Sequence, residues 1–457
     1  MASGDALIRS YHEHGPVSGR LIEDARAFMP GGDTRASAHY MPYPLFVDRA
    51  AGCRLYTPDG HELVDFMNNF TSLLHGHAFP PVVAAVTEQV ARGTAFAAPT
   101  TSQVDLARLL CERVPSLELV RFCASGSEAT LMTLRCARAA TGRQKIMKME
   151  GGYHGSYELA EVSLRPSADA RGPLEAPASV PVDASIPDSA LDDAVICPFN
   201  QPELARALIR RHAEELAAII VEPALGSMGM IPASRAFLAV LREEATRAGI
   251  VLIFDEVITL RLAPGGAQAL YGITPDLTAM GKIIGGGLPI GAFGGRADLM
   301  ALFDPGRAAP VLHASTFSGN PLSMAAGLAA MVPADAATFE RLDRLGERFR
   351  EGVDRVFGQR GIKGCASGVG SLSQIHFTES AVEDARQSYD GMVAAGPVPR
   401  WLHLGMLRRG VSSASRLMYC ISSPMREAEV DFALDALNDT LGELRPVIER
   451  EWPALLR

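Results

Sequence analysis

An apolar segment that ends in an acidic residue, and a glycine-rich turn that carries a lysine, have the clearest chemical content in this sequence. Asp255 closes the run Ile253-Phe254-Asp255, and Lys282 lies downstream in Gly281-Lys282-Ile283-Ile284-Gly285. A carboxylate beside a pyridine nitrogen keeps that nitrogen protonated, so the ring can accept the electron pair of a broken bond. A lysine amine can form a Schiff base with an aldehyde and then carry a proton. The pair predicts an enzyme that uses pyridoxal phosphate.

Each of these two residues also has a purely structural interpretation. Asp255 could cap the next helix or pair with an arginine, and Lys282 could be a solvated surface residue. The carboxyl ends of strands are, however, where open α/β sheets bind ligands. The apolar and glycine neighbours of Lys282 predict an enclosed amine, whose pKa falls and which becomes nucleophilic.

A turn rich in serine and glycine suits the phosphate group of such a cofactor. The strand-like Arg121-Phe122-Cys123 leads through Ser125-Gly126-Ser127 into a helical segment over 130–140. Backbone N–H groups and the dipole at a helix N-terminus favour a phosphate. An ordinary serine N-cap explains this turn when it is taken alone. With the aspartate and the lysine in the same chain, we interpret it as a phosphate site.

Two further loops contain side chains that suit a flat, phosphorylated ligand. In Gly151-Gly152-Tyr153-His154-Gly155 the glycines allow close approach of the backbone, and the Tyr153 ring could stack on a ligand. The polar loop His313–Pro321 opens a helix, and Thr316 could add one phosphate ligand. Both patterns are also common in ordinary turns and helix caps.

Two other patterns resemble binding motifs but lack the residues that would complete them. The pair in His75-Gly76-His77 has no cysteine or carboxylate cluster beside it, so a metal site is not expected. The glycines of 285–295 do not form the Gly-x-Gly-x-x-Gly pattern between a strand and a helix, so a dinucleotide site is unsupported.

An α/β core must position these residues. The short runs Ala218-Ile219-Ile220-Val221 and Ile250–Phe254 are wholly apolar and are separated by a helical stretch over 232–249. Such runs are typical of strands in a parallel sheet that is covered on both faces. Residues 54–66 alternate around an Asp-Gly turn, which predicts an antiparallel hairpin near the N-terminus.

The remainder of the chain predicts a long loop and a second, smaller domain. Residues 165–193 are rich in proline and alanine without periodicity, which favours a structureless surface loop over a lid. A helical tract over 321–360 precedes strand-like segments at 371–377 and 417–422. We expect a large domain with a mainly parallel sheet between helices, and a smaller α+β domain.

The expected domain boundaries follow from these patterns. Residues 1–66 are assigned to the N-terminal segment of the small domain, 67–325 to the large domain and 326–457 to the C-terminal small domain.

Composition narrows the class of protein. With 457 residues and 47% hydrophobic content, the chain can bury a large core. A net charge of −9 without a basic run makes nucleic acid a poor partner. The 7 cysteines are scattered and include no Cys-x-x-Cys, so they are expected to be reduced thiols. No apolar run has membrane-spanning length, and the first residues lack the apolar core of a signal peptide; we expect a cytosolic protein.

Taken in order, the motifs resemble those of the class III aminotransferases, which are pyridoxal-phosphate enzymes of fold type I. The segments that carry the resemblance are Ser125–Ala129, Gly152–Gly155, Val221-Glu222-Pro223, Phe254–Val257, Gly281–Gly287 and Thr316–Pro321. They are spread over nearly the whole chain, and together they are very specific.

The resemblance implies a role for each site residue. The implied cofactor-binding residues are Ser125, Gly126, Ser127, Tyr153, Glu222, Asp255, Val257, Lys282 and Thr316. Lys282 would form the Schiff base and Asp255 would contact the pyridine nitrogen. Val257 and Tyr153 would lie on the two faces of the ring. Thr316 would reach the phosphate of a neighbouring subunit, so the resemblance also implies a homodimer with shared sites.

Within the class, the segment 275–296 resembles glutamate-1-semialdehyde aminomutases and β-amino-acid aminotransferases of the β-phenylalanine type about equally. Residues 261–264 and 412–416 are more similar to the second group. Where the aminomutases usually carry a Phe-Glu pair, this chain has Arg416-Leu417. Arg35 matches a carboxylate-binding arginine of the subgroup, and a guanidinium can grip a carboxylate bidentately. A solvated loop arginine is the alternative for Arg35.

The sequence therefore predicts an aminotransferase that moves the amine of a β-amino acid to a 2-oxo acid through pyridoxamine phosphate. Lys282 would shift the proton, while Arg35 and Arg416 would bind substrate carboxylates. One alternative is an aminomutase that moves the amine within a single substrate. The other is a cofactor-binding scaffold without turnover, against which the intact Lys282 and Asp255 argue.

Overall fold

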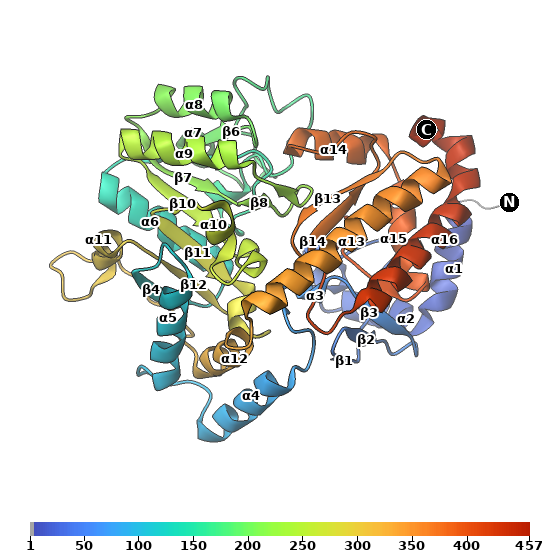
Figure 1. The fold of residues 1–457 in the computed structure, drawn as a ribbon, viewed down its shortest axis with the longest axis horizontal. Helices are drawn as coiled ribbons and strands as arrows, with labels where there is room; N and C mark the ends of the chain where they lie inside the picture. The colour runs from blue at the N-terminus through green and yellow to red at the C-terminus, as the bar shows by residue number, and fades with distance from the viewer. Residues whose placement is uncertain (1–3) are drawn as a thin grey trace. The chain divides into compact units, whose positions relative to one another are not determined.

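The computed structural model describes the chain from Gly4 to Arg457 (Figure 1). The chain forms two compact units. Unit 1 contains the chain up to Phe79 together with Glu340–Val382 and Asp390–Arg457, and unit 2 contains Pro80–Phe339 and Glu383–Tyr389. The sequence predicts domain boundaries after residues 66 and 325, whereas in the structure the chain passes from unit 1 to unit 2 after residue 79 and back to unit 1 after residue 339.

A sheet of seven strands forms the centre of unit 2. In spatial order its strands are β4 (Leu119–Cys123), β12 (Gly291–Gly295), β11 (Leu277–Gly281), β10 (Val251–Asp255), β7 (Leu216–Val221), β5 (Lys145–Met149) and β6 (Ala194–Cys197). Strand β12 is antiparallel to both of its neighbours, and the pairs from β11 to β6 are parallel. The mainly parallel sheet predicted from the sequence is confirmed, with the two wholly apolar runs forming β7 and β10.

Helices pack against this sheet and have well-defined ends. Helix α6 (Gly126–Thr141) packs against β11 and β12, while α9 (Arg235–Ala248) packs against β7 and β10. Ser125 and Ser234 cap their N-termini by accepting hydrogen bonds from backbone N–H groups. Gly142 ends α6 with φ +71°, in the left-handed region that glycine adopts without steric cost.

Prolines separate helices that the sequence pattern joins. The expected helical tract over 321–360 is two helices, α12 (Pro321–Met331) and α13 (Ala336–Arg360). Pro333 interrupts the tract because it has no N–H group and disfavours helical backbone before it. No single described helix is long and apolar enough to cross a membrane, although α12 and α13 together pass that test by length and composition.

The proline-rich segment 165–193 is only partly irregular. Its last six residues form helix α7 (Asp188–Asp193), so the prediction of a wholly structureless loop was wrong there. The remainder is held to the rest of unit 2 by side chains. Arg386 donates to the carbonyl of Gly172 at 3.1 Å, and Ser163 Oγ donates to that of Ala178 at 2.9 Å.

Unit 1 contains a sheet that joins the two ends of the chain. Strands β2 (Arg54–Tyr56) and β3 (Glu62–Asp65) form the predicted antiparallel hairpin, and β1 (Arg49–Ala51) pairs with β2 in antiparallel fashion. Strand β15 (Val411–Ser412) then pairs with β3 in parallel. A second antiparallel sheet has the order β13 (Cys365–Val369), β14 (Leu372–His376) and β16 (Met418–Cys420).

Residues 68–71 form a left-handed turn without glycine. Their φ angles are +49°, +47°, +52° and +73°. Asparagine tolerates this conformation, but Phe70 and Thr71 disfavour it by about 1–2 kcal/mol per residue. Asp65 Oδ1 stabilises the turn by accepting the N–H groups of Met67 and Asn68 at 2.9 and 3.1 Å.

The other elements complete the layers of the two units. They include α1 (Gly4–His14), α2 (Pro16–Arg26), α4 (Pro80–Arg92), α5 (Thr101–Arg113), α8 (Pro202–Arg211), α10 (Gly266–Tyr271), α11 (Ala297–Met300), α14 (Ala385–Ala394), α15 (Val398–Arg408), α16 (Glu427–Glu451) and the short strands β8 (Ala224–Leu225) and β9 (Ile231–Pro232).

Candidate active site

Asp255 ends β10, and its carboxylate is paired with a histidine from the glycine-rich loop after β5. Asp255 Oδ2 lies 2.8 Å from His154 Nδ1, and Oδ1 accepts the N–H of Val257 at 3.1 Å. Burial lowers the pKa of His154, although the hydrogen bond to Asp255 opposes that shift. The histidine is therefore neutral at pH 7 and donates its Nδ1–H to the carboxylate.

Three small or branched residues bring the predicted phosphate turn, the aspartate strand and the lysine together. A Cβ added to Gly126 would lie 2.9 Å from Val257 Cγ1. A Cβ added to Gly281 would lie 3.5 Å from both Gly126 Cα and Val257 Cγ1. Gly281, which precedes Lys282, therefore packs against Gly126 at the start of α6 and against Val257. Segments far apart in the sequence meet at one end of the sheet.

Lys282 has an unusual backbone conformation for its residue type. Its φ is +51°, whereas the preceding Gly281 is extended. Non-glycine residues at positive φ are uncommon, and such strain clusters at functional sites. Lys282 is half-buried, whereas its apolar and glycine neighbours predicted an enclosed side chain.

The N-terminus of α6 contains a cap and N–H groups that the helix itself does not pair. Ser125 Oγ accepts the N–H of Glu128 at 3.2 Å, so this serine is an N-cap in the structure. The N–H groups of Gly126 and Ser127, in the first turn, have no acceptor inside the helix. Ser127 Oγ accepts the N–H of Ser156 at 3.4 Å, which places the glycine-rich loop beside this turn.

Glu222 organises the loop that carries Tyr153. Its two carboxyl oxygens accept the N–H groups of Tyr153 at 2.9 Å and of Gly226 at 3.1 Å. Burial and then the charge of Asp255 raise the pKa of Glu222, while the two backbone donors and Lys282 act in the opposite direction. The loop backbone is thereby fixed, and the Tyr153 ring stays partly exposed at 37%.

Thr316 lies on the surface of unit 2, in the loop that precedes α12. Its neighbours Leu312 and Phe317 are 73% and 59% exposed. Asn320 ends this loop and caps α12 by accepting the N–H of Leu322 at 3.0 Å. The helix cap expected here is thus Asn320, and Thr316 is free to face outward.

Arg35 and Arg416 gather around one aromatic ring in unit 1. The guanidinium carbon of Arg35 lies 5.1 Å from the centroid of Phe70, and that of Arg416 lies 5.5 Å from it. Arg35 also donates from Nη1 to Asn69 Oδ1 at 2.8 Å. The two residues that the sequence selected as carboxylate anchors are therefore neighbours. They lie far apart in the sequence, so tertiary structure and not local structure brings them together.

The histidines of the His75-Gly76-His77 segment have separate partners. His75 Nδ1 lies 3.0 Å from Ser423 Oγ, and His77 Nε2 lies 2.7 Å from Asp65 Oδ2. Within the part of the chain that the structure describes, no group of three metal-ligating side chains is found.

Two buried polar residues near the site were not selected from the sequence. His154 was recognised only as part of a glycine-rich motif, and its contact with Asp255 had no sequence signal beyond that motif. Lys148 lies inside the buried strand β5 and donates to the carbonyl of Ala160 at 2.8 Å. Burial lowers its pKa to about 7. The sequence does contain a signal that could have identified Lys148, since a lysine among the apolar residues of a central strand is unusual.

Comparisons with known proteins identify the family of this chain. The family described as aminotransferase class-III matches residues 35–421. The chain is 38% identical to a β-phenylalanine transaminase of Variovorax paradoxus over 95% of this chain and 94% of that protein. It is also 38% identical to a glutamate-1-semialdehyde 2,1-aminomutase of Methanopyrus kandleri, over 95% of this chain and 99% of that protein.

A solved structure extends the similarity to the fold. An omega-transaminase from Sphaerobacter thermophilus superposes with a TM-score of 0.90 and 44% identity, covering 95% of this chain and 99% of that one. The chain therefore belongs to the class III aminotransferases, which are pyridoxal-phosphate enzymes of fold type I.

Proposed function

We propose that this class III aminotransferase takes the amine from a β-amino acid and passes it to a 2-oxo acid. The observation that carries the substrate class is the pair of guanidinium groups, Arg35 and Arg416, over the Phe70 ring. A β-amino acid carries its carboxylate one carbon farther from the amine than an α-amino acid does. Two arginines on different segments can provide separate anchors for the donor and for the oxo acid.

The residues of unit 2 suit the cofactor of the family. We assign Asp255 to the ring nitrogen, Lys282 to the reactive carbonyl carbon, and Val257 and Tyr153 to the two ring faces. The N–H groups at the start of α6, with Ser125-Gly126-Ser127, suit its phosphate. Glu222 supports the site by holding the Tyr153 backbone. Pyridoxal phosphate supplies, when bound, an electron sink next to the carbon that carries the amine.

The chain itself supplies charge and a mobile proton. The Asp255 carboxylate receives a hydrogen bond from a neutral His154, so its negative charge is oriented but not neutralised by a cation. We assign proton transfer at the substrate carbon to Lys282 Nζ, since Lys282 is half-buried, has a strained backbone and follows β11 at the end of the sheet.

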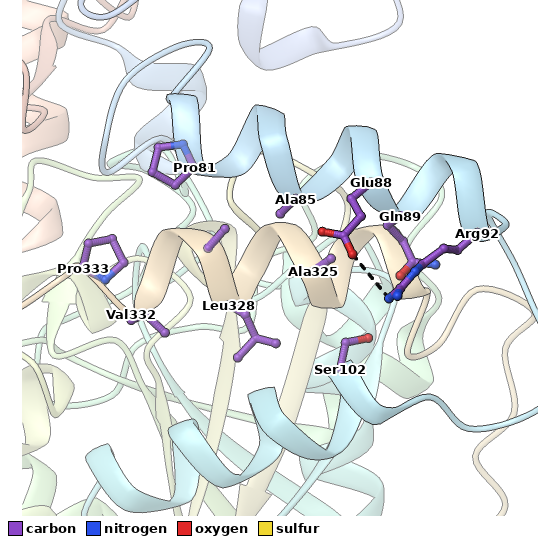
Figure 2. A pocket seen from close by; sticks show the side chains of 11 residues that line it. Pro81, Ala85, Glu88, Gln89, Arg92, Ser102, Ala325, Leu328, Val332 and Pro333 are labelled. Carbon is purple, nitrogen blue, oxygen red and sulfur yellow. Dashed lines mark ion pairs between the residues drawn. The ribbon is translucent and has the colours of Figure 1, made fainter.

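A homodimer completes the proposal. Thr316 lies on an exposed loop with large apolar neighbours, which suits a residue that contacts the phosphate bound by a second copy. Helices α4 and α12 of the same unit border an open groove of about 590 Å³, lined mainly by apolar side chains such as Pro81, Ala85 and Leu328 (Figure 2). Exposed apolar surface of this kind marks protein interfaces.

Light scattering of the purified protein tests this assembly. A dimer whose activity falls on dilution together with its mass would support shared sites. A fully active monomer would contradict them.

The aminomutase alternative rests on the equal identity, 38%, to the Methanopyrus kandleri enzyme. The two functions differ in whether an external oxo acid is required. We expect amine transfer from 3-amino-3-phenylpropanoate to 2-oxoglutarate, and no turnover of glutamate-1-semialdehyde without an added acceptor. The reverse result would assign the aminomutase function. If no amine converts the bound cofactor, the protein is a scaffold without turnover.

A further inference from the structure

The ring of Phe70 contacts both arginines that the proposed function assigns to substrate carboxylates. Its centroid lies 5.1 Å from Arg35 Cζ and 5.5 Å from Arg416 Cζ. A guanidinium within about 6 Å of an aromatic centroid is attracted by the ring quadrupole. The two positively charged guanidinium groups can therefore lie near each other, because both are attracted to the same uncharged ring.

The backbone that presents Phe70 is strained and is fixed from several directions. Phe70 has φ +52° within the left-handed turn 68–71. Asp65 binds the start of this turn through two N–H groups, and Asn68 Nδ2 donates to the carbonyl of Cys420 at 2.7 Å. Cys420 ends β16, the strand that begins two residues after Arg416. The turn that carries the ring is thus bonded to the segment that carries one of the two arginines.

The guanidinium of the other arginine contacts neutral groups, although the backbone N–H of Arg35 donates to Asp33 Oδ1 at 3.2 Å. Arg35 donates to the amide oxygen of Asn69, the residue before Phe70, at 2.8 Å. Among the described residues, the Arg35 side chain contacts Asn69 and Phe70 and forms no ion pair with a carboxylate. A partner without charge and an aromatic ring orient the guanidinium but leave its charge available for an incoming carboxylate.

We propose that Phe70 is a positioning residue that holds Arg35 and Arg416 in place for the carboxylate groups of the substrates. This inference rests on the proposed function, because it takes both arginines as substrate anchors. A leucine at this position would fill similar space without a quadrupole, whereas a tyrosine would keep the ring. The expected consequence is a loss of preference for carboxylate ligands, with no general loss of binding.

The test measures that preference directly in the holoenzyme. The probes are 3-phenylpropanoate and its uncharged amide, 3-phenylpropanamide, which share a skeleton and lack the reacting amine. Calorimetric dissociation constants of the two are compared for the wild type, Phe70→Leu and Phe70→Tyr. We expect Phe70→Leu to reduce the preference for the carboxylate about tenfold, in the range of two weakened cation–π contacts. Phe70→Tyr should remain within about twofold of the wild type.

A double-substitution cycle shows whether Phe70 acts through Arg35. If it does, Phe70→Leu should reduce the preference much less in an Arg35→Ala background than in the wild type. Equal effects in the two backgrounds, and again in an Arg416→Ala background, would overturn the inference.

Other outcomes separate this inference from the proposed function. If Arg35→Ala loses the preference while Phe70→Leu retains it, the positioning role is refuted and the anchors stand. If both arginine variants retain it, the anchors themselves are wrong, and the role of Phe70 is refuted with them. Equal weakening of acid and amide binding by Phe70→Leu, not rescued by Phe70→Tyr, would show a merely structural residue.

Discussion

His154 Nδ1 donates a hydrogen bond to Asp255 Oδ2 over 2.8 Å, and the two side chains are only 1% and 5% exposed. Since burial lowers the pKa of the histidine, the donor is a neutral imidazole. A neutral donor fixes the direction of the carboxylate, while a cation would also cancel its charge. The charge that faces the cofactor's ring nitrogen in the proposed site is therefore preserved.

Replacement of this carboxylate is expected to abolish most activity without unfolding the protein. Asp255→Asn keeps the size of the side chain and one oxygen that accepts a hydrogen bond, but it removes the charge that stabilises the transition state. We expect a loss of about 10³-fold or more in kcat/KM with most of the cofactor retained. Steady-state kinetics and the absorbance of the bound cofactor measure both quantities.

His154→Leu is the matched comparison, because it removes only the donor to Asp255. A hydrogen bond to a charged group contributes about 1.5–3 kcal/mol, so we expect a loss of about 10- to 100-fold. An Asp255→Asn variant that is more active than His154→Leu would contradict the assignment of the charge to catalysis.

Lys282 is expected to be the residue that binds the cofactor covalently. The purified holoenzyme should absorb visible light, and reduction with borohydride should attach the cofactor irreversibly to this lysine. Peptide mapping locates the label. A label on Lys148, the buried lysine of β5, or on any other lysine would refute the assignment, and Lys282→Ala should take up no label.

Arg35 and Arg416 are expected to serve different half-reactions. Arg35→Ala should impair the half-reaction with β-amino acids more than the one with the α-amino acid product, and Arg416→Ala should do the reverse. Loss of a bidentate partner costs about 2–5 kcal/mol by analogy with truncated charge pairs. Stopped-flow measurements of both half-reactions decide the matter, because equal losses in the two directions would exclude separate anchors.

The buried Lys148 is expected to make the free energy of unfolding depend on pH. Burial lowers its pKa to about 7 in the folded protein, below the value of about 10.4 in unfolded chains. Between these values the unfolded state binds more protons at this site, so its contribution raises stability as the pH increases. Relative to Lys148→Met, the wild type should gain up to about 1.4 kcal/mol per pH unit above pH 7. Denaturant unfolding at pH 7.0 and 8.5 measures this difference, and parallel pH profiles would contradict it.

The sequence predicted the parts of the fold and site that depend on local pattern. Wholly apolar runs identified β7 and β10, because a strand covered on both faces needs no polar side. Asp255 stood at the end of such a run, and Lys282 stood among glycines, so both could be selected by position. The contact of His154 with Asp255 could not, since it joins a loop and a strand that only the folded sheet brings together.

The sequence also could not predict backbone conformations that the residues concerned rarely adopt. Phe70 and Thr71 rarely adopt positive φ, and no residue in the turn is a glycine that would indicate it. Long-range hydrogen bonds, such as that from Asn68 to the carbonyl of Cys420, stabilise this turn. The shared contact of Arg35 and Arg416 with Phe70 depends on the same bonds, so neither arginine could be placed beside the other from the sequence.

The pairing of β3 with β15 has a consequence for biosynthesis. Val64 pairs with Val411, so the first sheet of unit 1 stays incomplete until the ribosome has made almost the whole chain. At usual rates of synthesis this delay is roughly 20 to 70 s. Residues 80–339 of unit 2 are contiguous and can fold during that time. The newly made hairpin would meanwhile present an open strand edge, the kind of surface that chaperones protect.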